Sequence, residues 1–135
     1  MATAKITYKG GLRTEATHLK SGTTILTDAP TDNRGQGAAF SPTDLIATGL
    51  GACVITIMGI KALDSEIDME GATAEVEKVM ASNPRRISEI KVTITMPHDE
   101  YTDKEKKLLE RAAHHCPVAK SLNENLKESI EIVYP

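Results

Sequence analysis

The sequence predicts an α+β fold in which antiparallel sheets surround one long, buried central helix. Three observations support this prediction. Segments with strand-like patterns lie toward both ends of the chain, and a long apolar segment with a helix start lies between them. The only aromatic residues among the 135 are three tyrosines and one phenylalanine, so aliphatic side chains must fill the core. The length fits a single domain over residues 1–135.

The N-terminal part is expected to form three strands followed by a loop. Residues 6–8 and 12–18 flank Gly10 and Gly11, which are a strong turn signal, and residues 23–27 fit a third strand. Residues 28–37 contain Asp, Asn, Pro and Gly in a pattern typical of a loop. A loop of this length is long enough to be functional rather than only a connection.

The central helix is expected to start at Ser41 and to run to about Leu63. Ser41 fits the N-cap, Pro42 fits the first helical position, and Asp44 lies where the acid of a capping box belongs. The apolar residues of this segment are not confined to one stripe, which predicts a helix buried on every side. They are Leu45, Ile46, Leu50, Val54, Ile55, Ile57, Met58 and Ile60.

The C-terminal half is expected to add a hairpin, two helices and a last strand. Residues 72–80 and 87–96 form the hairpin, and in the second of these segments apolar and polar residues alternate. Thr102 and Glu105 fit a second capping box, which opens a helix that reaches Ala113. A short helix at 117–122 and a strand at 129–134 complete the expected elements.

Composition and charge exclude several classes of partner. The net charge of −3 argues against a nucleic-acid or anionic-membrane partner, because no basic excess exists to neutralise phosphates. The longest apolar stretch, residues 45–60, is shorter than the ~20 residues that a membrane span needs. The start of the chain has no apolar run typical of a signal peptide. Two distant cysteines make no disulfide scaffold, so we expect a cytoplasmic protein with reduced thiols.

The two cysteines have different surroundings. Cys53 lies in the middle of the apolar helix, where a small buried residue is the ordinary interpretation and reactivity would need a nearby cation. Cys116 lies just before the helix start at Pro117, where the helix dipole and free amides favour a thiolate. A capping-region cysteine with no chemistry is the alternative for Cys116.

The sequence lacks the residue spacings typical of a metal site or of a Cys–His hydrolase. A metal site could draw on both cysteines and on His18, His114 and His115, but no Cys-x-x-Cys or His-x-x-x-His pattern supports it. A Cys–His hydrolase would need an oxyanion loop or a nucleophile elbow, and neither accompanies the cysteines. We therefore expect no metal and no cofactor.

Two segments centred on the cysteines resemble the OsmC/Ohr family. They are residues 40–53, with Cys53 at the end, and residues 115–122, with Cys116 near the start, and the resemblance covers essentially the whole chain. It implies an intertwined homodimer and a thiol-dependent peroxidase that reduces organic hydroperoxides. By the same resemblance Cys53 is the peroxidatic cysteine and Cys116 the resolving one. Thiolate attack on a peroxide gives a sulfenic acid, which the second thiol condenses to a disulfide, and a dithiol then reduces it.

The resemblance also implies an arginine and an acid near the first cysteine. Arg13, in a glycine-arginine turn like that of the Ohr branch, is the first candidate, and Arg34 is the alternative, as in the OsmC branch. The arginine would stabilise the thiolate while the acid orients the guanidinium. The family's acid lies ten residues before the cysteine, and this position here is Thr43.

Asp44 is the adjacent carboxylate and the remaining candidate for a catalytic acid. One residue of shift rotates it by about 100° around a helix, and nine residues place it roughly 13.5 Å along the axis from Cys53, on the opposite face. Asp44 is therefore either a helix cap or a group that acts on a partner subunit's site.

Two further hypotheses remain open beside the peroxidase. The missing acid at Thr43 and the aliphatic interior also fit a non-enzymatic family member that binds an apolar small molecule or senses oxidation without turnover. Purely structural cysteines would lie too far apart to bond. Under any of these hypotheses, a helix that is apolar all round predicts a homodimer whose core is shared between two subunits.

Overall fold

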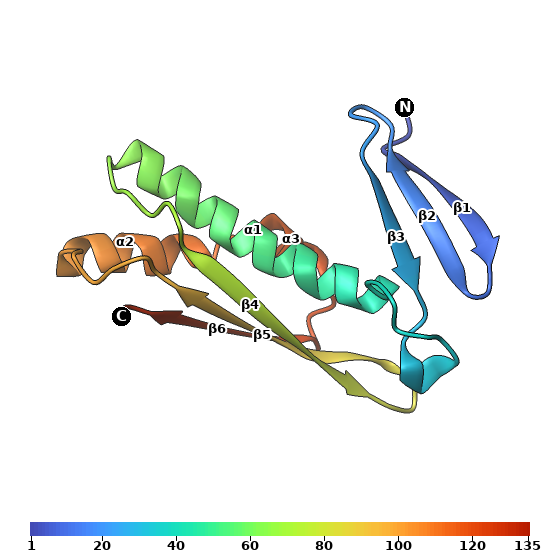
Figure 1. Ribbon diagram of the computed structural model, residues 1–135. Helices are drawn as coiled ribbons and strands as arrows, with labels where there is room; N and C mark the ends of the chain where they lie inside the picture. The colour runs from blue at the N-terminus through green and yellow to red at the C-terminus, as the bar shows by residue number, and fades with distance from the viewer. The chain divides into compact units, whose positions relative to one another are not determined.

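The computed structural model describes residues 1–135, and the chain divides into two units, Met1–Ile46 and Ala47–Pro135. Figure 1 shows the elements of each unit along the chain. The expected elements are all present, with bounds that differ by a few residues. The assignment of the whole chain to one domain stays a prediction.

The first unit contains an antiparallel sheet with the strand order β1-β2-β3. Its strands are β1 (Ala4–Gly10), β2 (Arg13–His18) and β3 (Thr24–Asp28). The turn between β1 and β2 requires glycine, because Gly10 and Gly11 have φ angles of 84° and 62°. These strands confirm the sequence-based expectation for this part of the chain.

One face of this sheet carries apolar side chains that are exposed. The register pairs Ile6 with Ala16 and Ala16 with Ile25, so these three residues share a face, and Tyr8 follows Ile6 on the same side. The exposed fractions are 60% for Ile6, 65% for Tyr8 and 45% for Ile25. The chain therefore does not cover this face with its own residues.

The loop after β3 leads to the start of the long helix α1 (Pro42–Asp64). It contains one turn of 3-10 helix, η1 (Thr31–Asn33). At the start of α1, the backbone N–H of Ser41 donates to Oδ2 of Asp44 at 3.0 Å, and the N–H of Asp44 donates to Oγ of Ser41 at 3.1 Å. This reciprocal pair is the capping box that the sequence predicts.

From Ala47 onward, α1 belongs to the second unit and packs along a sheet (Figure 1). Its fully buried residues follow helical spacing and form one face: Ala47, Leu50, Gly51, Val54, Met58 and Ala62. A Cβ at Gly51 would lie 2.5 Å from Cγ1 of Val76, which shows how closely α1 approaches strand β4 (Thr73–Ala81).

The other side of α1 is not covered by a single chain. Ile60 is 51% exposed and Leu63 is 81% exposed, because one sheet can cover only one face of a helix within this chain. The bounds of the helix agree with the expected run from Ser41 to about Leu63. With 23 residues and a mean hydropathy of 1.8, α1 has the length and composition to cross a membrane, although its packing on the sheet is that of a core helix.

The second sheet has the order β4-β5-β6, with β5 at Arg86–Thr95 and β6 at Lys127–Val133. β4 and β5 are antiparallel, but β6 runs parallel to β5, which corrects the expectation of purely antiparallel sheets. The reason is the connection: α2 (Asp103–Ala113) and α3 (Pro117–Ser121) form a crossover between β5 and β6, and such a crossover returns the chain to the same end of the sheet.

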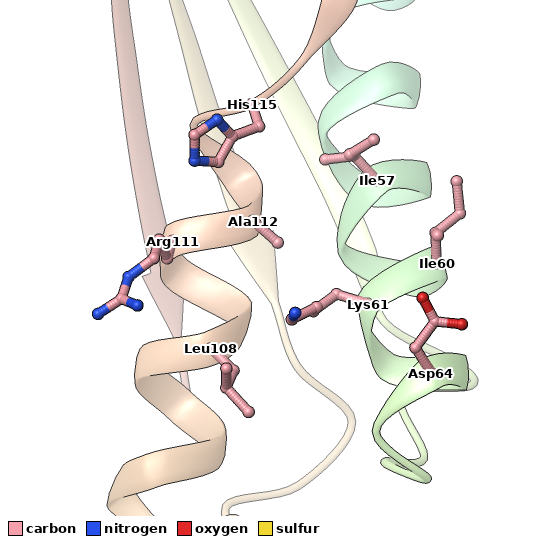
Figure 2. Close-up of a pocket in the computed structure, with 8 residues that line it drawn as sticks. All are labelled: Ile57, Ile60, Lys61, Asp64, Leu108, Arg111, Ala112 and His115. Carbon is pink, nitrogen blue, oxygen red and sulfur yellow. The ribbon is translucent and has the colours of Figure 1, made fainter.

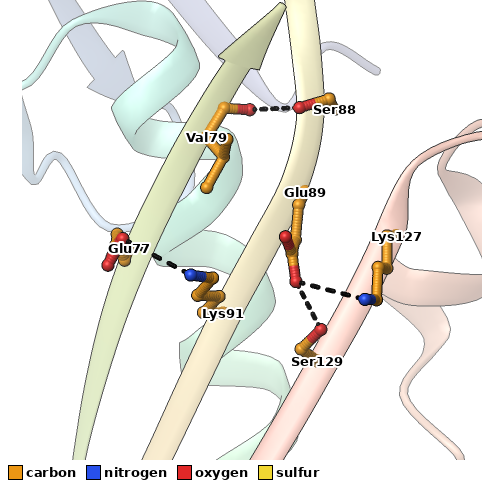
Figure 3. Close-up of polar contacts among 7 residues, drawn as sticks. All are labelled: Glu77, Val79, Ser88, Glu89, Lys91, Lys127 and Ser129. Carbon is orange, nitrogen blue, oxygen red and sulfur yellow. Dashed lines mark hydrogen bonds and ion pairs between the residues drawn. The ribbon is translucent and has the colours of Figure 1, made fainter.

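The outer surface of this sheet is held by polar contacts across its strands (Figure 3). Oγ of Ser129 donates to Oε2 of Glu89 at 2.6 Å, and Nζ of Lys127 lies 3.9 Å from the same oxygen. These contacts lower the pKa of Glu89, with the Ser129 hydrogen bond as the largest cause, ahead of the opposing effect of burial and the charges of Lys127 and Lys91.

Candidate functional site

The thiols of Cys53 and Cys116 lie close enough to interact in the second unit. Cys53 projects from the middle of α1 and is half-buried, whereas Cys116 is the fully buried N-cap residue of α3. Both are free thiols. This contact counts against the hypothesis of two structural cysteines that lie too far apart to bond.

The buried position of Cys116 raises the pKa of its thiol. Burial is the largest cause, and the hydrogen bond with Cys53 adds to it by favouring the protonated form. The backbone N–H groups of Ala119 and Val118 act in the opposite direction. The helix start thus exerts the effect that the sequence predicts, but burial outweighs it, and Cys116 stays protonated at neutral pH.

A cavity of about 300 Å³ lies between α1 and α2 (Figure 2). Ile57 lines it one helical turn from Cys53 on the same side of α1, and His115 lines it immediately before Cys116 in the chain. Neither cysteine lines the cavity itself. Its lining residues are Ile57, Ile60, Lys61, Asp64, Leu108, Arg111, Ala112 and His115.

The cavity combines an apolar wall with charged groups. Figure 2 shows Lys61 pointing from α1 toward α2, above Leu108. The side chains of Lys61, Arg111 and His115 make no hydrogen bond or ion pair with the rest of the chain, so their donors face solvent or a ligand. A cavity of this size and character suits an organic molecule with an apolar body and a polar end.

Arg13 lies in the first unit, at the start of β2. Its Nη2 donates to Oε1 of Gln36 at 2.8 Å and lies 3.6 Å from Oδ2 of Asp28, the last residue of β3. The carboxylate beside Arg13 is therefore Asp28, which sequence reasoning missed. The signal that could have found it is the hairpin register, because Arg13 and Asp28 are direct cross-strand partners.

The other predicted site residues serve local structure. Arg34 is exposed and ends η1 with a φ angle of 71°. Asp44 caps α1, and Oγ1 of Thr43 lies 3.2 Å from Oγ of Ser41 in the same cap. Arg13, Arg34 and Asp44 lie in the first unit and the cysteines in the second, so a role for any of them beside Cys53 stays a prediction.

The histidines considered as metal ligands lie in different units, His18 in the first and His114 and His115 in the second. Nδ1 of His18 is 2.6 Å from Oγ of Ser21 in the first unit, while His114 and His115 are exposed at the end of α2. The structure contains no group of three His, Cys, Asp or Glu side chains placed to hold a metal ion.

Comparisons with known proteins place the chain in one family. The model of the family described as OsmC-like protein matches residues 35–131. A crystal structure from Psychrobacter arcticus, provisionally named an osmotic stress induced and detoxification response protein, shares 54% identity over 98% of this chain and 96% of its own, with a TM-score of 0.93.

Two more distant structures share the fold. The organic hydroperoxide resistance protein OsmC of Legionella pneumophila is 17% identical over 98% of both chains, with a TM-score of 0.76. OhrB of Bacillus subtilis, named an organic hydroperoxide resistance protein, is 20% identical over 97% of this chain and 98% of its own, with a TM-score of 0.71. No match was found among curated proteins. The contact of the two cysteines, the α+β fold and the family match together lead to one conclusion: the chain belongs to the OsmC-like family.

Proposed function

We propose that this protein is a thiol-dependent peroxidase that reduces organic hydroperoxides with two cysteines. The observation that carries the proposal is the contact of the Cys53 and Cys116 thiols in a chain of the OsmC-like family. Two thiols in contact can form a disulfide without a large movement of the backbone. The naming of distant structural relatives as organic hydroperoxide resistance proteins is consistent with this substrate class.

The reaction proceeds in three balanced steps. The Cys53 thiolate attacks the outer oxygen of the hydroperoxide, the O–O bond breaks, and the alkoxide leaves as an alcohol after taking up a proton. The resulting sulfenic acid of Cys53 reacts with the Cys116 thiol, so that an S–S bond forms and water leaves. A dithiol then reduces this disulfide by thiol–disulfide exchange and is itself oxidised to a disulfide.

The different environments of the two thiols support this order of events. Cys53 is half-buried and partly accessible, whereas Cys116 is fully buried. The pKa of Cys116 is raised, so its S–H remains available as a donor to the sulfur of Cys53. The thiolate of Cys53 is the form that attacks the peroxide.

The cavity between α1 and α2 is the proposed binding site for the organic part of the substrate. Ile57, Ile60 and Leu108 offer apolar surface to a hydrocarbon group, and His115 lies at the end next to Cys116. We expect substrates with an apolar body to react faster than hydrogen peroxide, because only they gain free energy from this surface.

The active form is proposed to be a homodimer. Ile60 and Leu63 on α1 and Ile6 and Tyr8 on the first sheet are all at least half exposed in a single chain. Exposed apolar residues gathered on the faces of a helix and a sheet are typical of surfaces that a partner covers. A cytoplasmic location, expected from the reduced thiols, stays a prediction.

Replacement of each cysteine tests the proposed reaction. With cumene hydroperoxide and dithiothreitol, Cys53→Ser abolishes turnover, while Cys116→Ser retains one rapid turnover and accumulates a sulfenic acid that dimedone traps. Mass spectrometry of the wild type after one equivalent of peroxide shows an intramolecular Cys53–Cys116 disulfide. Unchanged turnover in Cys53→Ser would overturn the proposal.

A second candidate function is binding or sensing without turnover. It is favoured by Thr43 at the position of the family's acid and by the mixed apolar and charged cavity. This candidate predicts slow oxidation of Cys53 and a co-purified ligand in native mass spectrometry. Rapid consumption of organic peroxide eliminates it.

A further inference from the structure

The exposed side of α2 carries basic residues without acidic partners. Lys104, Lys107 and Arg111 follow one another at spacings of three and four residues, so they share one side of the helix. Of the four basic residues in α2, only Lys106 is in an ion pair, with Asp99 at 2.7 Å. The remaining cations form an unneutralised row in a chain whose net charge is −3.

Such a row destabilises the helix unless an anion lies beside it. Like charges three or four residues apart on a helix repel each other. Asp103 and Glu110 belong to the same helix but make no ion pair with Lys107 or Arg111, so α2 does not neutralise the row with its own acids. A bound anion would offset the repulsion, which makes the row a candidate anion site.

Two adjoining cavities connect this row to the apolar surface between α1 and α2. The first is the cavity of about 300 Å³ that has Ile57 and Leu108 in its wall (Figure 2). The second, of about 340 Å³, is lined by Lys104, Lys107, Leu108 and Arg111. Leu108 and Arg111 line both cavities, so one molecule can occupy the two together. Its apolar part would lie against Ile57 and Leu108, and its charged part among the cations.

The charges around the two cavities select for an anion. In Figure 2, Lys61 reaches from α1 toward α2 across the first cavity, and Arg111 extends from α2 on the side away from α1. Asp64 is the one acid that lines either cavity, and it is outnumbered by the lysines and the arginine that line them. This excess of positive charge attracts an anionic ligand and disfavours a cationic one.

We propose that α1 and α2 bind an organic phosphate that carries an apolar chain. A phosphate group has a charge of about −1.5 to −2 at pH 7 and several acceptor oxygens, so it engages more of these cations than a carboxylate does. The guanidinium of Arg111 offers parallel N–H groups to such a head group. The chain removes the apolar surfaces of Ile57 and Leu108 from water. The proposal goes beyond the peroxidase reaction, because binding needs no turnover and neither cysteine lines either cavity.

Titration calorimetry with decyl phosphate, kept below its critical micelle concentration, tests the proposal. We expect saturable binding of one molecule per chain, to the wild type and to Cys53→Ser alike. Each CH₂ removed from the chain, down to octyl phosphate, should weaken binding by up to about fourfold. Inorganic phosphate, decanol and decyltrimethylammonium should each bind about tenfold more weakly or worse, because each lacks either the apolar chain or the negative charge.

Substitutions in α2 locate the site. The double variant of Lys107→Gln and Arg111→Gln should raise the Kd for decyl phosphate about tenfold and make it less sensitive to salt, because two exposed ion pairs are lost. Both residues are exposed, and removal of their repulsion should leave Tm unchanged or raise it, so the variant folds. Leu108→Ala should weaken the binding of decyl phosphate but not that of inorganic phosphate.

Lys120→Gln is the matched control for the loss of a surface charge. Lys120 is exposed in the second unit and lines neither cavity, so its substitution should leave the Kd for decyl phosphate unchanged. An equal loss of affinity in Lys120→Gln and in the α2 double variant would show that only net charge matters, which contradicts a site on α2.

Several other results would overturn the proposal. Decyl phosphate that binds no more tightly than inorganic phosphate would show that the apolar cavity is not used. Equal affinity for decyltrimethylammonium would show that the cations do not select the ligand. Binding to vesicles of anionic lipid without saturable binding of monomeric decyl phosphate would indicate a membrane surface instead.

The outcome is separate from that of the proposed function. If Cys53→Ser leaves peroxide consumption unchanged, the peroxidase fails, while binding of decyl phosphate to the wild type still supports the site on α1 and α2. If Cys53 is essential for turnover and decyl phosphate does not bind, only the present proposal fails.

Discussion

The two units of the chain bury opposite kinds of residue. In Ala47–Pro135 the fully buried residues are apolar, with Leu50, Met58 and Ile94 among the largest. In Met1–Ile46 the buried residues are polar, while Ile6 and Tyr8 stand exposed on the face of the sheet. A unit of the second kind gains little from the hydrophobic effect on its own. The second unit therefore contains the hydrophobic core. The first unit is built around a polar cluster, and its exposed apolar face needs a partner surface to cover it.

The largest expected effect is a loss of stability when the core of the second unit is disrupted. Leu50→Ala should lower the free energy of unfolding by about 2–5 kcal/mol, because it leaves a cavity between α1 and the sheet. Thr56→Ala, at an exposed position of the same helix, should change it by less than about 0.5 kcal/mol. Urea denaturation measures both, and equal losses would contradict a core centred on this face of α1.

The next prediction concerns the open face of the first unit. Ile6→Glu should shift the protein from dimer to monomer, because the apolar contact of a buried isoleucine is worth about 1.5–3 kcal/mol and the charge adds a desolvation penalty. Thr7→Glu changes the adjacent exposed residue, which points to the opposite face of β1, and should leave the mass unchanged. Sedimentation equilibrium measures the mass of each variant, and a monomeric wild type would contradict the predicted dimer.

Alanine substitutions at two glycines of α1 should change the free energy of unfolding in opposite directions. Gly51→Ala should cost about 1–3 kcal/mol, because the new Cβ would lie 2.5 Å from Val76. Gly49→Ala meets no atom within 4 Å and should stabilise the protein by up to about 1 kcal/mol through helix propensity. Thermal unfolding compares the two variants, and a similar loss at both positions would show that the contact with β4 is not what separates them.

The smallest effect is a loss of stability at high pH in the second unit. Burial, followed by the charges of Glu110, Tyr101 and Asp99, raises the pKa of Tyr134 to about 12 from an ordinary value of 10.0. The folded state then holds a proton that the unfolded state releases, so stability is complete below pH 10 and falls as the pH rises toward 12. The raised pKa of Cys116 acts in the same direction.

Tyr134→Phe is the control for this pH dependence. The hydroxyl of Tyr134 is buried and has no hydrogen-bond partner, so its removal should change stability little at pH 7 and flatten the decline between pH 10 and 12. Urea midpoints, measured across this range with a reducing agent present, test the prediction. A variant that declines as steeply as the wild type would contradict the assignment to Tyr134.

The sequence by itself determined the secondary structure and the family, because both depend on residues that are close along the chain. Ser41 with Asp44 and Thr102 with Glu105 form the expected capping boxes through bonds that span three residues. The segments around Cys53 and Cys116 carried the resemblance that the family match confirms.

Only the tertiary structure decided which distant residues meet and what burial does to them. The sequence could suggest a pair of Cys53 and Cys116, but their contact and the raised pKa of Cys116 depend on how α3 packs against α1. It predicted an acid beside Arg13 from the family pattern, and the pairing of β2 with β3 supplied Asp28 instead. The physical reason is that a capping bond is fixed by neighbours in the chain, whereas contacts and burial across a fold are fixed by the packing of whole elements.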